Sequence, residues 1–381
     1  MCCFVICQFL LSFYTTKAPI IQQIALATKQ TYNYRDAPDV DYIASLGSYG
    51  TEEHNVAREL INKFCKTQKN PLPLPFTVSL PVLEKIAAEC EKRMEMRDFN
   101  MYLPHDWFAM EAPPYILQKV FGLRDVAMFW EGHNLADPKL FQNIIMETHG
   151  ATLSTFIPLS LHGDGGAFSK NDSLMVISMR SITSAANVAH SQLFLAGVPK
   201  ACMNRSSNPA QDTMTCLWKV LAWSFSAVFS GKHPELDHRG QLWTDKYRML
   251  KAGTSLTPKN YKGCIFALTG DFEYFQNELK IRCYSFTECC WLCPASKTNP
   301  EFPFNDFRAE AAWRTTCHSP AFHRANKPSS HVIWTIPGVV AESIHVDSLH
   351  CNEEGTAAHT LANVLFDHVV GREWDGTQDA K

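Results

Sequence analysis

Two aspartates have the same sequence setting, since each follows an apolar run and stands next to glycine. Asp164 lies within the motif HGDGG (162–166) after the run 153–161, and Asp271 follows Gly270 after the run 263–269. If the two runs form adjacent parallel strands, both carboxylates reach one edge of the sheet. Carboxylates that close repel each other unless a cation lies between them. Mg²⁺ or Mn²⁺ suits oxygen ligands, and a pair of such ions can clamp the reacting oxygens of a phosphodiester.

Each aspartate also has a purely structural interpretation. Asp-Gly is a common turn sequence, which would explain Asp164. Asp271 precedes a segment, 272–279, that is expected to be helical, and aspartate is a good N-cap. The catalytic interpretation therefore depends on both residues reaching the same site.

A third acidic residue is available near the end of the chain. Asp347 precedes His350 by three positions, and Glu353 and Glu354 precede a helix expected over 356–370. Asp347 and Glu354 are the candidates to complete a catalytic triad. The structural alternative for the glutamates is the favourable position of acidic side chains near a helix N-terminus.

The cysteines in CCWLC (289–293) have the spacing of half a zinc site. Cys290 and Cys293 are separated by two residues, and His345 and His350 are the best candidates for the remaining ligands, followed by Cys351 and His359. A thioredoxin-like redox pair is a second interpretation, although such a motif opens a helix directly after a strand. The third is a pair of buried free thiols.

Histidines and aspartates of the same region suggest one alternative chemistry. A zinc metallohydrolase could gather one or two metal ions among His-Asp clusters. It requires His162 and His350 to approach within coordinating reach. The side chains that it would use are His162, Asp164, His345, Asp347 and His350.

The segment 232–262 is locally basic and contains aromatic residues. Such a segment could follow a phosphate backbone, or it could be a solvated loop. Its basic residues are Lys232, Arg239, Lys246, Arg248, Lys251, Lys259 and Lys262, its aromatic residues Trp243, Tyr247 and Tyr261, and its acidic residues Glu235, Asp237 and Asp245.

Composition narrows the class of protein. The chain has 381 residues, 46% hydrophobic and 19% charged, which excludes global disorder, and its net charge of -3 gives no whole-chain attraction to nucleic acid. The 14 cysteines at irregular spacing indicate a reducing compartment, nuclear or cytoplasmic. The apolar run 1–14 lacks a preceding positive charge and is short for a membrane helix, so no membrane association is expected; a secretory or membrane role is the alternative.

The elements that must position these residues begin near residue 153. Strands are expected over 153–161, 173–178, 192–198 and 263–269, with helices over 214–229 and 272–279, and this order gives a mixed α/β sheet. The preceding part is expected to be mostly helical, with helices at 51–64, 81–96 and within 116–150 and a proline-rich linker at 70–75.

The ordered set of motifs resembles the catalytic region of CACTA-type (Tnp-like) DNA transposases and large sets of predicted protist proteins. The resemblance covers about residues 150–370 and rests on HGDGG (162–166), LTGDFEYFQNEL (268–279), CCWLC (289–293), IPGV (336–339), DSLH (347–350) and AHTLANVL (358–365). It implies a ribonuclease-H-like mixed β-sheet flanked by helices. It also implies that Asp164 and Asp271 bind Mg²⁺ (or Mn²⁺), with Asp347 or Glu354 as third acid, and that Cys290, Cys293 and His350 form a Zn²⁺ knuckle.

The expected organisation follows from that resemblance. Residues 1–30 form an apolar segment, 31–150 a mostly helical region, 151–370 the transposase-like domain with an insertion at about 283–345, and 371–381 a tail. The expected function is metal-dependent DNA cleavage and strand transfer, with DNA as partner. The chain is short for an active transposase and lacks an evident separate DNA-binding domain, so a degenerate or domesticated copy is included. The alternative is a non-catalytic interaction module of the same fold, stabilised by zinc.

Overall fold

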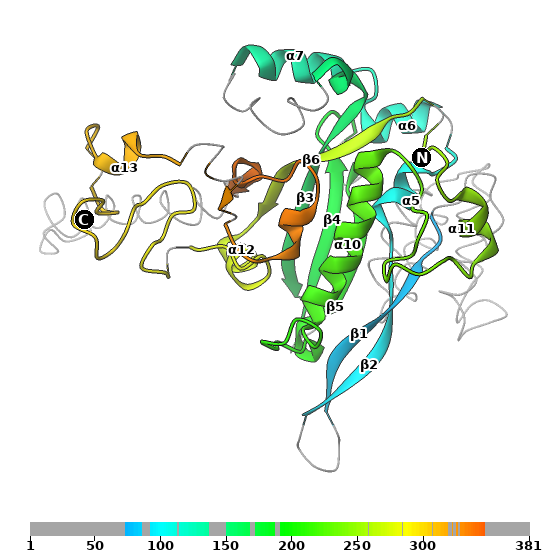
Figure 1. Cartoon of the computed structure of the whole chain (residues 1–381), viewed down its shortest axis with the longest axis horizontal. Coiled ribbons are helices and arrows are strands. Elements are labelled where there is room, and N and C mark those ends of the chain that lie inside the picture. The colour runs from blue at the N-terminus through cyan, green and yellow to red at the C-terminus, as the bar shows by residue number, and fades with distance from the viewer. Residues whose placement is uncertain are drawn as a thin grey trace, which may run out of the picture. The chain divides into compact units, whose positions relative to one another are not determined.

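The structure is a computed structural model of the chain (Figure 1). It describes residues 73–85, 92–112, 114–136, 150–167, 172–186, 191–257, 259–283, 285–306, 308–318, 322, 325–326 and 328–346. The chain divides into two compact units, 1–266 with 330–340 and 267–329 with 341–381. Among the described helices, none is both long and apolar enough to cross a membrane. The expectations for residues 1–14, 51–64 and 356–370 fall outside the described residues.

The described residues form a mixed α/β structure, as expected, around a five-stranded sheet. Its strands are β3 (Phe156–Ala167), β4 (Ser173–Ser181), β5 (Leu193–Pro199), β6 (Lys262–Gly270) and β7 (Ile344–Val346), in the order β5-β4-β3-β6-β7. The β3–β4 and β4–β5 pairs are antiparallel, and the β6–β7 pair is parallel. The strands expected at 173–178, 192–198 and 263–269 are confirmed.

The helix expected over 81–96 is wrong, because the described residues of this segment, 81–85 and 92–96, belong to a β-ribbon. β1 (Phe76–Lys85) pairs antiparallel with β2 (Lys92–Met101) along its whole length. Pro81, interpreted as a helix start, lies inside β1. The burial has the two-residue period of a strand, since the side chains that face the core are Val78, Leu80 and Val82.

Helices and single turns complete the fold. The helices expected within 116–150 are confirmed as α6 and α7 up to residue 136, and the helices expected at 214–229 and 272–279 are confirmed as α10 and α12. The helices are α5 (Pro104–Phe108), α6 (Pro114–Phe121), α7 (Val126–Ala136), α10 (Thr213–Ser230), α11 (Lys246–Lys251), α12 (Phe272–Asn277) and α13 (Ala312–Thr315). The 3₁₀ turns are η5 (Gly150–Thr155), η6 (Lys200–Cys202), η7 (Val332–Thr335) and η8 (Ala341–Ser343).

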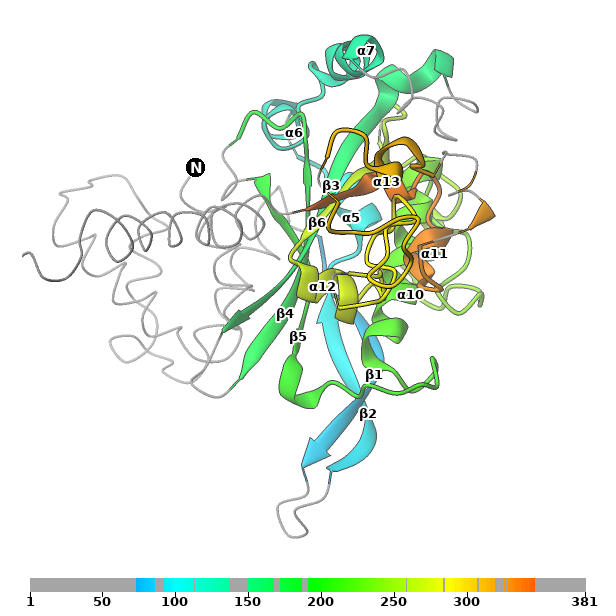
Figure 2. The same ribbon diagram turned by 90° about the vertical axis from the view of Figure 1, so that its left-hand side faces the viewer.

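The central helix α10 has both of its ends specified by sequence. Asp212 is the N-cap, and its side chain accepts a hydrogen bond from Thr215 N at 2.7 Å. Gly231 ends the helix with a φ of 74°, a left-handed conformation that glycine adopts without a Cβ clash. Figure 2 shows α10 and α5 on the same side of β3, β4 and β5.

A glycine in β6 allows α5, α10 and β3 to approach one another. A Cβ placed on Gly263 would lie 2.6 Å from Phe108 Cζ of α5 and 2.6 Å from Val228 Cγ1 of α10. It would also lie 3.0 Å from Leu159 Cδ1 of β3. These neighbours are buried core side chains with little room to move, so the position accepts no side chain.

Gly263→Ala is expected to lower the free energy of unfolding by about 1–3 kcal/mol, because it overpacks this contact. Gly166→Ala is the matched control, since Gly166 also lies in the sheet but no atom stands within 4 Å of its added Cβ. That control should change stability by less than about 0.5 kcal/mol. Urea unfolding of both variants measures the difference, and equal stability of the two would contradict the packing described here.

Candidate functional site

Asp164 lies inside a strand, not at the end of one. β3 continues through the whole HGDGG motif to Ala167, and Asp164 is paired in register with Val176 of β4. The turn interpretation is therefore wrong as well. The residue is exposed, and its Oδ1 accepts a hydrogen bond from Gly165 N at 2.6 Å. A Cβ on Gly165 would lie 2.5 Å from Lys200 Nζ, so the glycine makes room for this lysine on the face of β3 opposite to the Asp164 side chain.

Asp271 directly follows β6 and caps the helix after it. Its Oδ1 accepts a hydrogen bond from Tyr274 N at 2.6 Å, which confirms the structural interpretation of this residue as an N-cap. The cap starts α12, whose Tyr274 and Phe275 are buried. This hydrogen bond uses one carboxylate oxygen only.

The other predicted acidic residues follow the last described strand. β7 pairs with β6 in parallel, with His345 opposite Thr269 and Val346 opposite Gly270. Asp347, His350 and Glu354 lie outside the described residues. Gly270 and Val346 are paired across the two strands. In the sequence, Asp271 directly follows Gly270 and Asp347 directly follows Val346.

The predicted zinc half-site lies in a loop of the second unit. Leu292 N donates a hydrogen bond to Cys290 Sγ at 3.3 Å. Burial, together with the neighbouring Cys290 and Cys317, raises the pKa of the Cys293 thiol to about 12, although a hydrogen bond with the Ala295 backbone acts in the opposite direction. A thioredoxin-like arrangement is not present, because the two cysteines precede no helix start.

The same loop is joined by a cysteine that the sequence analysis did not single out. His318 N donates a hydrogen bond to Leu292 O at 2.8 Å, which holds Cys317 and His318 beside the loop of Cys290 and Cys293. A Cys-His pair after a C-x-x-C motif was the available signal in the sequence. Within the described part of the chain, no group of three or more His, Cys, Asp or Glu side chains is arranged to hold a metal ion.

A buried polar network in the first unit has the residue types of a hydrolase triad but no access for a substrate. His105 Nδ1 lies 2.8 Å from Ser224 Oγ, and both residues have 0% exposure. His105 Nε2 lies 3.5 Å from Asp106 Oδ1. The adjacent cavity of about 10 Å³ is the size of roughly one water molecule. The network therefore serves stability, not nucleophilic catalysis.

Arg248 closes this network and is not available to nucleic acid. Its Nη2 donates to Asp106 Oδ2 at 2.7 Å and its Nη1 to Asp106 Oδ1 at 3.2 Å. The guanidinium also lies 5.3 Å from the ring centres of both Phe76 and Trp243. A bidentate ion pair flanked by aromatic rings is among the stronger interactions that arginine makes. It connects α11 to α5 and β1.

Other cations of the basic segment also have local contacts. Lys251 Nζ lies 4.5 Å from the ring centre of Tyr247, and Lys262 Nζ lies 5.2 Å from that of Phe156. Trp243 is buried, and its indole donates to Pro234 O at 2.9 Å. The exposed cations of the segment are Lys232, Arg239, Lys246 and Lys259.

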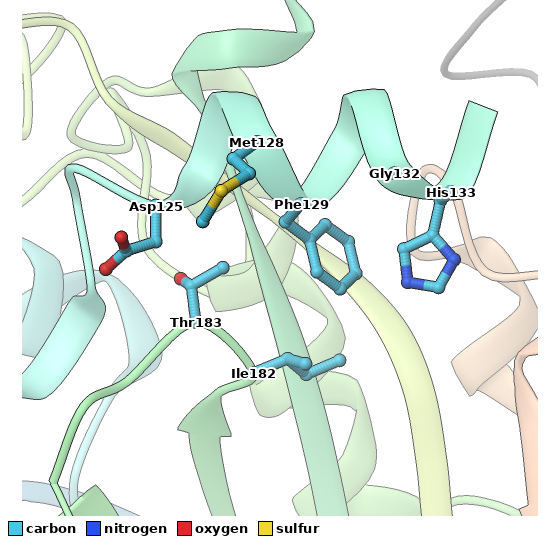
Figure 3. Close-up of a pocket in the computed structure, with 7 residues that line it drawn as sticks. All are labelled: Asp125, Met128, Phe129, Gly132, His133, Ile182 and Thr183. Carbon is cyan, nitrogen blue, oxygen red and sulfur yellow. The ribbon is translucent and has the colours of Figure 1, made fainter. Parts of the chain in front are cut away.

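An open apolar pocket of about 420 Å³ lies between α7 and the end of β4 (Figure 3). Phe129 faces Ile182 and Thr183, with Asp125 and His133 at opposite ends. Asp125 accepts a hydrogen bond from Gln118 Nε2 at 3.4 Å, and the His133 ring packs on Phe129 at 4.3 Å. These contacts place no acid–base pair in the pocket, and the sequence analysis had not predicted it.

Comparisons with family models, with curated proteins and with solved structures return no match to this sequence.

Because His105 is buried, we expect the free energy of unfolding to decrease in acid. Burial lowers the pKa of His105 from 6.5 to about 3, with the Arg248 charge also acting downward and Asp106 opposing. Because the folded pKa is depressed, the stabilisation is complete above pH 6.5 and is lost as the pH falls toward 3. Between pH 7 and pH 5, this one group should cost about 2 kcal/mol.

His105→Asn tests this expectation, because its amide can still bond Ser224 but does not titrate. Urea unfolding at a series of pH values should give the variant a shallower loss of stability than wild type between pH 7 and pH 5. Parallel profiles for the two proteins would show that His105 is not the titrating group.

Proposed function

We propose that this chain is a transposase-derived domain of ribonuclease-H-like fold that cleaves DNA and transfers strands with a divalent metal. The observation that carries the proposal is the strand order, in which one aspartate lies within a strand and the other directly follows the neighbouring strand. Asp164 lies on β3, and Asp271 directly follows β6, the neighbour of β3 in the strand order.

The strand order supports the fold assignment. In a ribonuclease-H-like sheet, an antiparallel meander of three strands is extended beside its first strand by the fourth strand and then the fifth. The order β5-β4-β3-β6-β7 corresponds to that description, with β3 as first strand and α10 connecting β5 to β6. Asp164 then belongs to the first strand and Asp271 to the end of the fourth.

The two carboxylates have the chemistry that Mg²⁺ or Mn²⁺ requires. Hard divalent cations favour carboxylate oxygens, and the hydrogen bonds described above use Oδ1 of each aspartate and leave Oδ2 for a ligand. When bound, such an ion would activate water or a 3′-hydroxyl and stabilise the charge on phosphorus. The role of the chain is to hold the carboxylates, since Gly165 N and Tyr274 N each fix one oxygen.

The exposed cations of segment 232–262 are the proposed contacts with the DNA backbone. Lys232, Arg239, Lys246 and Lys259 are exposed, and exposed lysines and arginines neutralise phosphates without reading sequence. Arg248 is excluded from this role because Asp106 already binds it.

A second candidate, the non-catalytic module stabilised by zinc, is favoured by a specific observation. Asp271 is fully explained as a helix cap, and the loop of Cys290 and Cys293 is joined by Cys317. This candidate predicts zinc binding without cleavage of DNA. The zinc hydrolase alternative depends on His350, which lies outside the described residues, and it stays a prediction.

Asp164→Asn and Asp271→Asn are each expected to lower Mn²⁺-dependent cleavage of a DNA duplex by at least about 100-fold, because each removes a charged metal ligand. Asparagine caps helices as well as aspartate does, so Asp271→Asn keeps the start of α12 while it removes the charge. Gel analysis of cleavage products with Mn²⁺ and with EDTA measures the effect, and DNA affinity by fluorescence anisotropy should change little.

Asp212→Asn is the matched control for these variants. Asp212 caps α10 through the same type of hydrogen bond, but it is buried away from solvent. Cleavage should survive in this variant. If the wild-type protein shows no cleavage with Mn²⁺, or if Asp164→Asn cleaves as fast as Asp212→Asn, the catalytic proposal is wrong and the non-catalytic module takes its place.

The third acid can be identified separately. Asp347 directly follows the position at which β7 pairs with β6, and we expect it to be the third ligand in preference to Glu354. Asp347→Asn should therefore abolish Mn²⁺-dependent cleavage, whereas Glu354→Gln should retain at least about a tenth of it. The reverse result would assign the role to Glu354.

A further inference from the structure

We propose that Arg180 of β4 binds a phosphate group of a nucleic acid strand on the face of the sheet that carries Asp164. The identity of the strand, DNA, rests on the proposed function. The residue is new to that function, because it would hold the strand at a point away from the metal ion. All the residues on which the proposal depends belong to the first unit.

The two faces of the sheet are distinguished by the alternation of side chains along β3. Leu159 and Leu161 have 0% exposure, and Leu159 lies on the face that α5 and α10 cover, beside the position of Gly263. Because successive side chains of a strand point to opposite faces, the side chain of Asp164 points away from α10. The side chains of β3 that share its face are those of Ser160 and His162.

Arg180 lies on the same face as Asp164, because the strand register places it opposite Ser160. Residues directly opposite each other on paired strands have their side chains on one face. The residues before and after Arg180, Met179 and Ser181, both have 0% exposure, as expected of side chains that point to the covered face. The guanidinium therefore points to the face of the sheet that α5 and α10 do not cover.

The charge of Arg180 is unpaired within the described residues. Its side chain is half-buried, and its Nε is shielded from water without a hydrogen-bond partner. Among the described residues, no carboxylate forms an ion pair with it. The other half-buried arginines in this part of the chain both have such a partner. Arg248 binds Asp106, and Arg282 binds Glu288.

An unpaired and partly desolvated guanidinium is suited to bind an oxyanion. A donor that has lost water without gaining an acceptor costs free energy, and a bound phosphate would offset that cost. The planar fork of Nη1 and Nη2 can donate to two phosphate oxygens in parallel. The side chains beside it are polar, since His162 is paired with Ser178 and the Gln192 amide donates to Ser178 Oγ. A phosphodiester, which presents two free oxygens, fits this chemistry.

The register also determines how far Arg180 lies from Asp164 along the sheet. Asp164 is paired with Val176, and Arg180 follows Val176 by four positions on β4. At about 3.4 Å per residue, the two levels are about 14 Å apart. A stacked DNA strand rises about 3.4 Å per nucleotide, so the phosphate at Arg180 would be about four nucleotides from the phosphate at Asp164. One strand lying along β4 can therefore reach both residues.

Binding of a fluorescein-labelled DNA duplex in EDTA tests the site without any contribution from cleavage. Arg180→Gln should weaken the binding about 10-fold at low salt. It should also lower the slope of log affinity against log salt by about one, because one phosphate contact is lost. Arg180→Lys should restore the slope but only part of the affinity, because an ammonium group lacks the planar fork.

Arg97→Gln is the matched control. It makes the same change in net charge on a strand of the same unit, but Arg97 is already paired with Glu84. Its DNA affinity should stay within about twofold of that of wild type. The melting temperature of Arg180→Gln should be equal to or above that of wild type, because the variant removes a partly desolvated charge. A structural role for Arg180 would lower it instead.

Inorganic phosphate, added at constant ionic strength, distinguishes a strand from a free anion. Micromolar phosphate should leave the DNA bound to wild type. If it displaces the DNA from wild type but not from Arg180→Gln, the ligand is a free phosphate and the proposal is wrong. The proposal is also overturned if wild type does not bind the duplex, if Arg180→Gln binds it as tightly as Arg97→Gln, or if Arg180→Gln melts at a lower temperature and Arg180→Lys binds as wild type does.

The outcome for Arg180 is separable from that for the nuclease. DNA binding that depends on Arg180, in a wild-type protein that does not cleave with Mn²⁺, would reject the catalytic activity and retain this site. Cleavage with Mn²⁺, combined with equal DNA binding by Arg180→Gln and Arg97→Gln, would retain the activity and reject the site.

Discussion

The close approach at Gly263 is the constraint from which the rest of the first unit follows. Because this residue has no side chain, Phe108 of α5, Val228 of α10 and Leu159 of β3 can meet on β6. The contact fixes α10, the longest described helix, against β6. Asp164 lies on β3, so the position of this proposed metal ligand depends on a contact that one added methyl group would overpack.

The positive charges of the segment 232–262 have two roles: some stabilise the fold through local contacts, and others are exposed on the surface. Arg248 is bound by Asp106 and flanked by two rings, so its guanidinium contributes to folding. Buried His105 lies beside it, and a neutral imidazole there avoids a second positive charge next to Arg248. From composition alone, all seven basic residues of the segment looked equivalent. The structure separates those whose charge has a local partner from the exposed ones that a phosphate backbone could meet.

The local sequence pattern was sufficient to predict an element when the residues within that element determine its secondary structure. The apolar periodicity of 214–229, with Asp212 before it and Gly231 after it, gave α10, and strands 173–178 and 263–269 followed from short apolar runs. The local sequence pattern failed where pairing with another strand determines the secondary structure. The segment 81–96 has apolar residues at a spacing that fits a helix, but its first part, 81–85, pairs with its last part, 92–96, and the spacing of apolar residues does not reveal this pairing. Cys317 was missed for the same reason, because its place is set by the hydrogen bond of its neighbour His318 to Leu292, two residues that are distant in the chain.

A capping aspartate and a metal-binding aspartate are compatible roles for Asp271. The cap uses the lone pairs of Oδ1, and the hydrogen bond from Tyr274 N fixes the plane of the carboxylate. A fixed carboxylate loses less conformational entropy when it binds a cation. The helix that it caps leads into the cysteine loop, and the loop returns to it through a ring contact between Trp291 and Phe275 at 6.4 Å. The ring contact therefore restrains α12 from its far end, and with it the carboxylate that starts this helix.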